Sequence, residues 1–197
     1  PRNVALSPLS GVDKNEAFDV TQYAIACDNY FMKRITSYKL PRKIKVAFSN
    51  SEEDTACCTV QDLGFLAVNK DGKEYFKVYI GGGLGRNPKL ALIYPELIEA
   101  SEVLNYVEAM VRLFKAEGNY ENKAKARVRY MVDKLGEEGF INEYKKYVEI
   151  VKNEENYKLS VEPKKYTKAG IETNIINSRL VAQKQLGLYS VYVHPVG

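Results

Sequence analysis

The sequence predicts an α+β fold in which a mixed or antiparallel sheet is flanked by helices. Strand-like alternation is concentrated in residues 44–80, helix-like periodicity dominates residues 101–152, and no regular strand–helix alternation links the two regions. Strands and helices that are segregated along a chain are typical of α+β domains rather than of parallel βαβ folds. With 197 residues, 45% of them hydrophobic, the chain can form a substantial core in one domain or in two small ones.

The region before the first predicted strand is expected to hold a loop and one helix. The first fifteen residues include several serine, proline, glycine and aspartate residues, which favour turns. Between Asp19 and Thr36, apolar residues recur at three- and four-residue steps, which predicts a helix that Asp19 can cap. Pro41 excludes a continuation of this helix.

Three strands are predicted next. Side chains from Ile44 to Phe48 alternate with the period of two that is expected of a strand. Residues 63–69 and 74–80 predict two further strands, and Lys70-Asp71-Gly72 between them predicts a hairpin turn.

Three helices, a linker and a final strand complete the expected order. The first helix is predicted from an N-cap at Ser101 to a stop at Gly118, and the others cover residues 122–135 and 137–152. Beyond them, the polar residues 153–182 predict a linker with a short helix near 171–181, and residues 188–193 alternate as a strand.

The composition excludes several classes of protein. Lys and Arg number 29 against 25 Asp and Glu, and the resulting net charge of +4 is mixed in sign along the chain, unlike a nucleic-acid coat. No apolar run reaches the ~18 residues that a membrane-spanning helix needs. We therefore expect neither a nucleic-acid nor a membrane partner.

The cysteines and the two ends of the chain carry further expectations. Cys27, Cys57 and Cys58 are odd in number and include an adjacent pair, unlike a disulfide framework, and no signal peptide is recognisable; we therefore expect a reducing, cytoplasmic compartment. Three thiols at this spacing cannot by themselves form a four-ligand zinc or iron–sulfur site, so no metal ligand is predicted. The chain starts at Pro1 and stops after a strand-like run, which predicts a fragment of a longer protein.

A glycine cluster, Gly81-Gly82-Gly83-Leu84-Gly85, follows the third predicted strand. It fails the dinucleotide fingerprint because Arg86 or Pro88 stands where the third glycine is needed. Two interpretations stay open: a tight loop with positive φ or a close backbone contact, and a loop that admits a flat cofactor. The single histidine, His194, argues against a histidine metal site or a histidine triad.

Two cationic motifs are candidate anion-binding sites. Lys43 and Lys45 lie two residues apart on a predicted strand, so their ammonium groups can converge on one anion through charge-assisted hydrogen bonds. The alternative is a solvated pair on an edge strand. A second group has helical spacing, and for it a solvated helix face is the alternative: Lys123, Lys125, Arg127 and Arg129.

Several segments, in this order, resemble the siroheme-containing nitrite and sulfite reductases. The similarity covers almost the whole chain and is carried by Arg2-Asn3-Val4, Ser7-Pro8-Leu9-Ser10-Gly11, Leu40-Pro41-Arg42-Lys43-Ile44-Lys45, Asp62-Leu63-Gly64-Phe65, the glycine cluster, residues 118–127, Gln183-Lys184-Gln185-Leu186-Gly187 and His194-Pro195-Val196-Gly197. It implies a first nitrite/sulfite reductase repeat domain over residues 1–152, a linker over 153–182 and the start of a second ferredoxin-like half-domain over 183–197.

The resemblance implies an enzyme that reduces nitrite to ammonia or sulfite to sulfide by six electrons. Such enzymes use a siroheme bridged to a [4Fe–4S] cluster, and ferredoxin is the expected electron donor. The C-x5-C and C-x3-C cysteine motifs that hold the cluster in this family are absent here. We therefore expect the 197-residue fragment alone to be inactive and to carry no bound cofactor when purified. The alternative is a non-enzymatic module that binds an anion or a tetrapyrrole.

Residue by residue, the resemblance assigns the catalytic, anion-binding cations to Arg2, Lys43 and Lys45. It implies that siroheme, which carries eight carboxylates, is bound by Arg2, Asn3, Lys123, Arg127 and Arg129. Tyr120 and Lys123 depart from the arginines of the family motif. Plant-type nitrite reductases tend to carry Asn where Lys45 stands, so Lys45 favours sulfite, although nitrite stays open.

Overall fold

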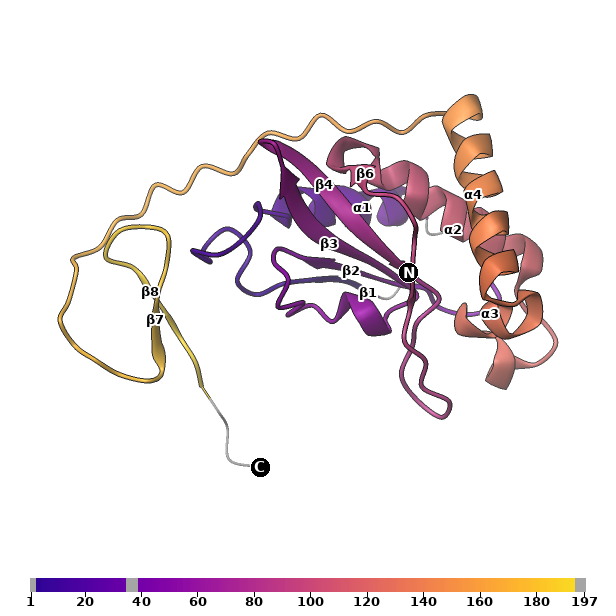
Figure 1. Cartoon of the computed structure of the whole chain (residues 1–197), viewed down its shortest axis with the longest axis horizontal. Helices are drawn as coiled ribbons and strands as arrows, with labels where there is room; N and C mark the ends of the chain where they lie inside the picture. The colour runs from indigo at the N-terminus through magenta and orange to yellow at the C-terminus, as the bar shows by residue number, and fades with distance from the viewer. Residues whose placement is uncertain (1–2, 35–38, 194–197) are drawn as a thin grey trace.

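The structure, a computed structural model, describes residues 3–34 and 39–193. Within them, a six-stranded mixed sheet forms the centre of the protein (Figure 1). The strands are β1 (Asn3–Leu6), β2 (Lys45–Ser49), β3 (Leu63–Lys70), β4 (Lys73–Ile80), β5 (Leu92–Ile93) and β6 (Ile98–Glu99). β1, β2 and β3 are parallel neighbours, and β4 runs antiparallel to β3, β5 and β6. The predicted α+β class with a mixed sheet is confirmed.

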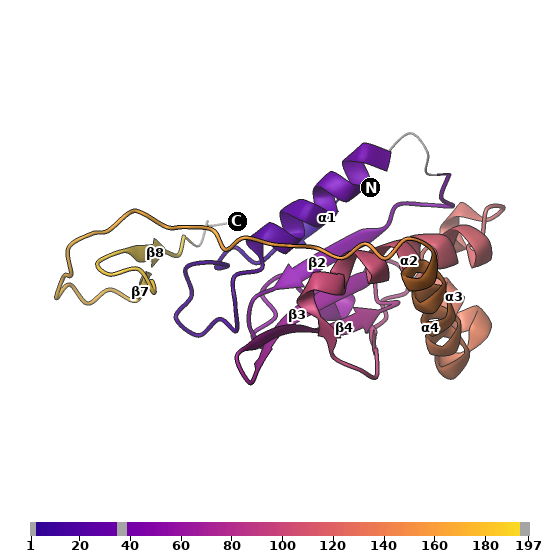
Figure 2. The same cartoon turned by 90° about the horizontal axis from the view of Figure 1, so that it is seen from above.

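One described helix lies between β1 and β2 in the sequence, and the other three follow β6. They are α1 (Thr21–Arg34), α2 (Val103–Glu117), α3 (Arg129–Leu135) and α4 (Glu137–Glu154), with the 3₁₀ turns η1 (Cys58–Val60), η2 (Ala100–Glu102) and η3 (Lys123–Lys125). α1 and α2 pack on one face of the sheet (Figure 2). α4 packs against α2 and α3, and the buried Tyr144 hydroxyl of α4 donates to the Tyr106 carbonyl of α2 at 2.8 Å.

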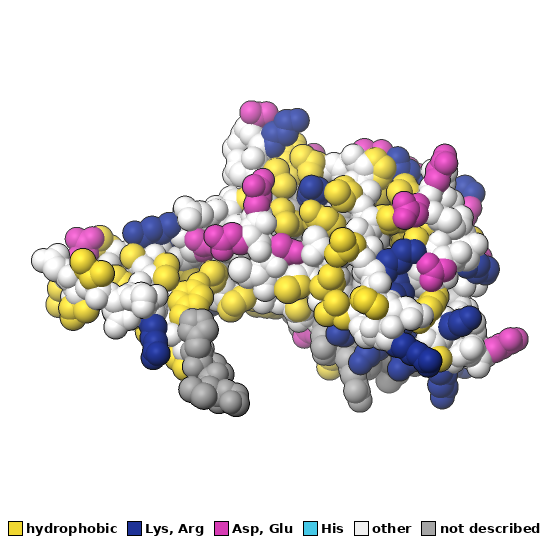
Figure 3. Space-filling model, turned by 60° about the horizontal axis from the view of Figure 1, so that its bottom comes forward, with side chains coloured by type: hydrophobic (Ala, Val, Ile, Leu, Met, Phe, Trp, Pro, Cys, Tyr) yellow, Lys and Arg dark blue, Asp and Glu magenta, His cyan; other side chains and the backbone are white. Residues whose placement is uncertain are grey.

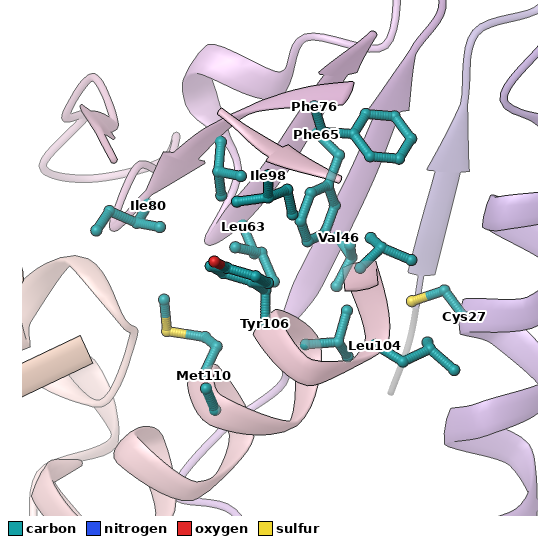
Figure 4. Packing of buried hydrophobic residues seen from close by; sticks show 14 of the residues in the cluster. Cys27, Val46, Leu63, Phe65, Phe76, Ile80, Ile98, Leu104, Tyr106 and Met110 are labelled. Atoms are coloured by element: carbon teal, nitrogen blue, oxygen red, sulfur yellow. The ribbon is translucent and has the colours of Figure 1, made fainter. Parts of the chain in front are cut away.

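The main core lies between the sheet and these helices. The stripe predicted for α1 is buried, with Cys27 at 0% and Phe31 at 1% exposure, and Figure 4 shows Cys27 directed toward the sheet beside Val46. Because side chains alternate along a strand, Val46 and Phe48 of β2 enter this core while Lys45 and Ala47 point to the other face. That second face carries a smaller cluster of Ala47, Ala56, Cys58, Leu66 and Tyr79.

Local sequence chemistry explains the elements that were predicted well. Asp71 and Gly72 adopt φ of 53° and 76°, as a two-residue hairpin turn requires, and join β3 to β4 in the predicted place. An Asp19 carboxylate oxygen accepts the Thr21 amide at 2.9 Å, which satisfies one of the free N–H groups at the start of α1. Gly118 ends α2 as predicted.

Four predictions about elements are corrected. The first fifteen residues contain β1, which is too short to alternate visibly and is stabilised by its parallel partner β2. α2 begins at Val103 after the turn η2, so Ser101 is not its N-cap. The helix predicted over residues 122–135 is the turn η3 followed by the shorter α3. Residues 171–181 form no helix, and β7 (Leu180–Ala182) pairs with β8 (Tyr189–Val191).

The C-terminal segment lies beside the N-terminal loop. Residues 156–177 form neither helix nor strand, and the β7–β8 hairpin lies apart from the main sheet (Figure 1). The Lys184 amide donates to the Val12 carbonyl at 2.9 Å, and the Tyr166 hydroxyl donates to Asp19 at 2.8 Å. Among the helices of the described residues, none combines the length and the apolar character needed to cross a membrane.

Candidate functional site

The first cationic motif lies at the start of β2. The strand begins at Lys45, so Lys43 precedes the hydrogen-bonded ladder and the prediction that both lysines lie within the strand is corrected. The alternation persists in burial, because Ile44 and Val46 are each 1% exposed, whereas Lys43 is exposed and Lys45 is half-buried. Neither ammonium forms an ion pair with a described residue.

The N-terminal strand reaches the same edge of the sheet. Asn3, the first residue of β1, is the register partner of Lys45. Asn3 therefore adjoins the lysine motif through the sheet. Arg2 itself lies outside the described residues, as does the motif that begins at His194.

A buried carboxylate, Asp62, connects this strand to the second cationic motif. Its side chain is 0% exposed, and Oδ2 accepts the Lys45 backbone amide at 2.8 Å and the Arg127 guanidinium at 2.6 Å. The Asp62 carbonyl accepts the Gly81 amide at 2.9 Å, at the start of the glycine cluster. Three segments that the sequence presents separately therefore meet at one residue.

The electrostatics of Asp62 reflect two opposing effects. Burial penalises the charged carboxylate and raises its pKa, while Arg127 and the Lys45 amide favour the charged form. The first effect is the larger, so the pKa of Asp62 lies above its usual value. The 2.6 Å contact with Arg127 is a charge-assisted hydrogen bond, and we take the carboxylate to be ionised at neutral pH.

The second cationic motif divides into an exposed and a buried half. Lys123 and Lys125 lie in the turn η3 and are exposed, as the solvated interpretation predicts. Arg127 is only 13% exposed, and Arg129 at the start of α3 is 5% exposed. The chain leaves the helical path between η3 and α3, so the predicted helical spacing of these four residues is wrong.

Arg129 lies buried against the glycine cluster. A Cβ atom at Gly83 would lie 2.9 Å from Arg129 Nη1, so the guanidinium packs directly on the backbone of the glycine cluster. The Arg129 guanidinium also lies 4.9 Å from the centre of the Tyr130 ring. Its Nε and Nη1 atoms, like Nε of Arg127, have no hydrogen-bond partner among the described residues. Buried donors of this kind are costly unless an acceptor reaches them.

The glycine cluster forms a close backbone contact, as one of the two interpretations predicts. Gly81 has φ of 78°, and a side chain there would collide with Val132 of α3. The loop then closes through a bridge between Gly83 and Lys89, whose ammonium pairs with Asp133 at 2.7 Å. The loop is thereby fixed against α3.

A pocket of about 480 Å³ opens beside this loop. Lys125 and Arg127 line it together with Glu117 and Asp133, and each of these carboxylates is already paired with a lysine. Figure 3 shows many Lys and Arg side chains over the end of the protein that carries α3 and α4. The unpartnered arginine nitrogens and the basic pocket can hold carboxylates or other oxyanions.

The cysteines do not form a cluster site. Cys27 belongs to the main core and Cys58 to the cluster on the opposite face of the sheet. Burial raises the pKa of the Cys58 thiol to about 12, which makes it inert. Within residues 3–34 and 39–193, no group of three His, Cys, Asp or Glu side chains could hold a metal ion. The thiols present do not fit a [4Fe–4S] cluster.

The role of Asp62 was not predicted from the sequence, where the residue stands only within the segment Asp62-Leu63-Gly64-Phe65. The available signal was a single acidic residue directly before a strongly apolar strand, where a buried carboxylate needs a cation or several N–H donors. The pattern could not indicate that the cation is Arg127, 65 residues away.

The chain is similar in sequence to proteins named as sulfite and nitrite reductases. The chain is 33% identical over 111 residues to the sulfite reductase (NADPH) hemoprotein beta-component of Acidithiobacillus ferrooxidans, which covers 53% of this chain and 20% of that protein. It is 27% identical over 154 residues to the chloroplastic ferredoxin–nitrite reductase of Arabidopsis thaliana, covering 74% of this chain and 26% of that one. The chain thus spans about a quarter of the length of these relatives.

A solved structure shares the fold. The NirA protein of Mycobacterium tuberculosis superposes with a TM-score of 0.69 and 24% identity, over 93% of this chain and 32% of that chain. The family model described as nitrite and sulphite reductase 4Fe-4S domain matches residues 1–152. The chain belongs to the nitrite and sulfite reductase family.

Proposed function

We propose that this chain is part of a longer enzyme that reduces nitrite to ammonia or sulfite to sulfide by six electrons. The observation that carries the proposal is the convergence at Asp62 of the strand that bears Lys45, the glycine cluster and Arg127. Family membership and the names of the relatives support the class of reaction. We also propose that residues 1–152 form the first reductase repeat domain, 153–182 a linker and 183–197 the start of a further domain.

In this proposal, Arg2, Lys43 and Lys45 bind the substrate anion. Each electron that reaches the anion adds negative charge, and cations that are already in place stabilise that charge without reorganisation. The lysines can also pass protons to the developing product. Lys43 and Lys45 suit this role because neither is committed to an ion pair with a described residue.

Asn3, Lys123, Arg127 and Arg129, with Arg2, would hold siroheme. The unpartnered nitrogens of Arg127 and Arg129 fit a macrocycle with eight carboxylates, because each carboxylate can supply a missing acceptor. When bound, siroheme supplies the iron at which the anion is reduced. We derive no step through a [4Fe–4S] cluster, since Cys27, Cys57 and Cys58 do not fit one.

We also propose a preferred substrate and an electron donor for the longer enzyme. A second lysine favours the more highly charged anion, so we propose sulfite ahead of nitrite. Relatives are named after ferredoxin and after NADPH. We propose ferredoxin as the donor, since it serves the single-chain members of the family.

A porphyrin titration tests the proposal. We expect the purified 197-residue chain to be colourless and inactive, because it holds only part of the siroheme site. Titration with an octacarboxylate porphyrin then measures the affinity that remains. Arg129→Met should weaken this binding, while Lys152→Met, which removes a cation that is paired with Glu102 and does not line the basic pocket, should not. Equal affinity for all three proteins would contradict the assignment.

Activity separates the enzyme from the alternative of a non-enzymatic binding module. We expect a longer polypeptide that contains this chain to reduce sulfite or nitrite with a chemical reductant. Porphyrin binding without reduction of either anion by that polypeptide would favour the binding module.

A further inference from the structure

Asp62 occupies an unusual position in the sheet. It directly precedes β3, and the β2–β3 ladder starts one residue later with Val46 opposite Leu63. The amide of Lys45, the residue before Val46, therefore meets the Asp62 carboxylate rather than a backbone carbonyl. The side chain extends the ladder by one hydrogen bond and leaves the Asp62 carbonyl for Gly81.

A carboxylate at this position also neutralises a buried cation. Arg127 is 13% exposed and contacts Oδ2, the same oxygen that accepts the Lys45 amide. The pair fixes one side of the planar guanidinium, and Nε remains without a partner among the described residues. Arg127 is thus held in one orientation, and its side chain lines the basic pocket beside Lys125.

We propose that Asp62 is a positioning residue, which fixes the Arg127 guanidinium and the start of the Lys45 strand relative to each other so that both face one anionic ligand. The inference rests on the proposed function, because it assumes that Arg127 binds a carboxylate of the cofactor. Asp62 acts through Arg127 and Lys45 and touches no ligand itself. Its shared oxygen couples two segments that lie far apart in the sequence.

Asp54 provides a matched comparison. It is also a partly buried aspartate next to the sheet, and it accepts the Cys58 amide at 2.7 Å, the Thr59 amide at 3.1 Å and the Ser49 hydroxyl at 2.7 Å. No cation is among these partners. Asp54 orders its own loop, so Asp54→Asn reports the effect of losing a structural carboxylate without disturbing Arg127.

A double-mutant cycle provides the first test. The affinity of the 197-residue chain for an octacarboxylate porphyrin is measured for the wild type, Asp62→Asn, Arg127→Gln and the double variant. We expect Asp62→Asn to weaken binding about tenfold, the scale of one charge-assisted hydrogen bond. In the Arg127→Gln background, Asp62→Asn should change the affinity less than about twofold, because the effects of two substitutions are not additive when one residue acts through the other. Asp54→Asn should leave the affinity unchanged.

Arg127→Lys keeps the experiment decisive if Asp62→Asn does not fold. The lysine retains a positive charge beside Asp62 but lacks the planar fork. If Asp62 acts by orienting the planar guanidinium, Arg127→Lys should weaken porphyrin binding about as much as Arg127→Gln does. Wild-type affinity in Arg127→Lys, or equal effects of Asp62→Asn in both backgrounds, would overturn the proposal.

A measurement without ligand separates this inference from the proposed function. Hydrogen exchange of the Lys45 amide reports its bond to Asp62 directly. We expect exchange to become at least about tenfold faster in Asp62→Asn and to change in Arg127→Gln, since both donors share Oδ2. If the wild type binds no porphyrin but this coupling is present, the proposed carboxylate-binding role of Arg127 fails for this chain, while the coupling by Asp62 stands. If the Lys45 amide is unaffected by both variants, the positioning role is wrong.

Discussion

The lysines at the start of β2 and the arginines around the start of α3 carry the same charge in opposite settings. Lys43 and Lys45 are solvated or half-buried, and neither forms an ion pair with a described residue. Arg127 and Arg129 are almost fully buried, one paired with Asp62 and the other packed on Gly83. The solvated lysines cost the fold little and can adjust to a small anion. The two arginines are fixed in place: Arg127 balances the buried Asp62 carboxylate, whereas Arg129 lowers stability until an acceptor reaches its unpartnered nitrogens.

The largest effect should come from breaking the buried pair. Arg127→Leu leaves the Asp62 carboxylate buried without its cation, and the loss of one partner from such a pair costs about 3–5 kcal/mol. Chemical denaturation of the 197-residue chain measures the change in the free energy of unfolding. Lys43→Ala, the solvated counterpart, should leave it nearly unchanged. Similar losses for both variants would remove the distinction between the two regions.

The lysines should matter for turnover instead. In a longer polypeptide with activity, Lys43→Ala and Lys45→Ala should each reduce turnover about 10²-fold, the scale of one preorganised donor at a developing anion. Steady-state rates at saturating donor provide the measurement. Unchanged rates in both variants would exclude the start of β2 from the active site.

Substitution of Arg129 should raise the stability of the ligand-free chain and lower its affinity for the porphyrin. Arg129→Met replaces a buried cation that has two unpartnered nitrogens with an apolar side chain of similar length. We expect the ligand-free chain to gain about 1–3 kcal/mol of stability and to bind an octacarboxylate porphyrin less tightly. Thermal unfolding with and without the porphyrin tests both effects. A loss of stability without ligand would show that Arg129 already has an acceptor.

Lys45→Asn should shift the choice of substrate. The substitution keeps a hydrogen-bond donor and removes one charge, so a dianion loses more binding energy than a monoanion. We expect kcat/KM for sulfite to fall about tenfold more than that for nitrite, which needs ~1.4 kcal/mol of differential transition-state binding. The ratio is measured with one reductant at one pH. An unchanged ratio would mean that residue 45 does not sense ligand charge.

The smallest expected effect is on how the free energy of unfolding depends on acidic pH, through the shifted pKa values of Asp54 and Asp62. Burial tends to raise the pKa of Asp54, but hydrogen bonds from Ser49, Cys58 and Thr59 outweigh it, so the pKa lies below the usual 3.8. The ionised Asp54 carboxylate therefore adds to the free energy of unfolding above pH 3.8, and this stabilisation is lost as the pH falls through the lowered pKa. The titration of Asp62 has the opposite effect, because its pKa is raised. Its stabilisation of the folded state is present below pH 3.8 and is lost as the pH rises through the raised pKa.

Unfolding free energies of the wild type and Asp54→Asn, compared across the acid range, test this sign. The difference in the free energy of unfolding between the two proteins should shrink as the pH falls. Protonation of Asp54 in the wild type removes the same negative charge that the substitution has already removed. A difference that grows on acidification would contradict the assigned direction.

Local patterns predicted the fold where an element is long or has a characteristic turn. α4, the β3–β4 hairpin and the end of α2 at Gly118 lie where periodicity and turn residues indicated. The miss at β1 has a physical cause, since four residues carry too little alternation and the strand depends on hydrogen bonds to β2. The helix near residues 171–181 was wrong because polar residues without an apolar stripe gain little from packing.

The sequence by itself determined that Lys43 and Lys45 lie together, because neighbours two residues apart in an extended chain share a side. It also determined that a second cationic group exists near residues 123–129. Only the tertiary structure decided that Arg127 and Arg129 are buried rather than solvated, and that Asp62 joins Arg127 to the strand of Lys45. Charge type and short-range spacing are written in the sequence, whereas burial and partners 65 residues apart depend on how the sheet, the glycine cluster and α3 pack.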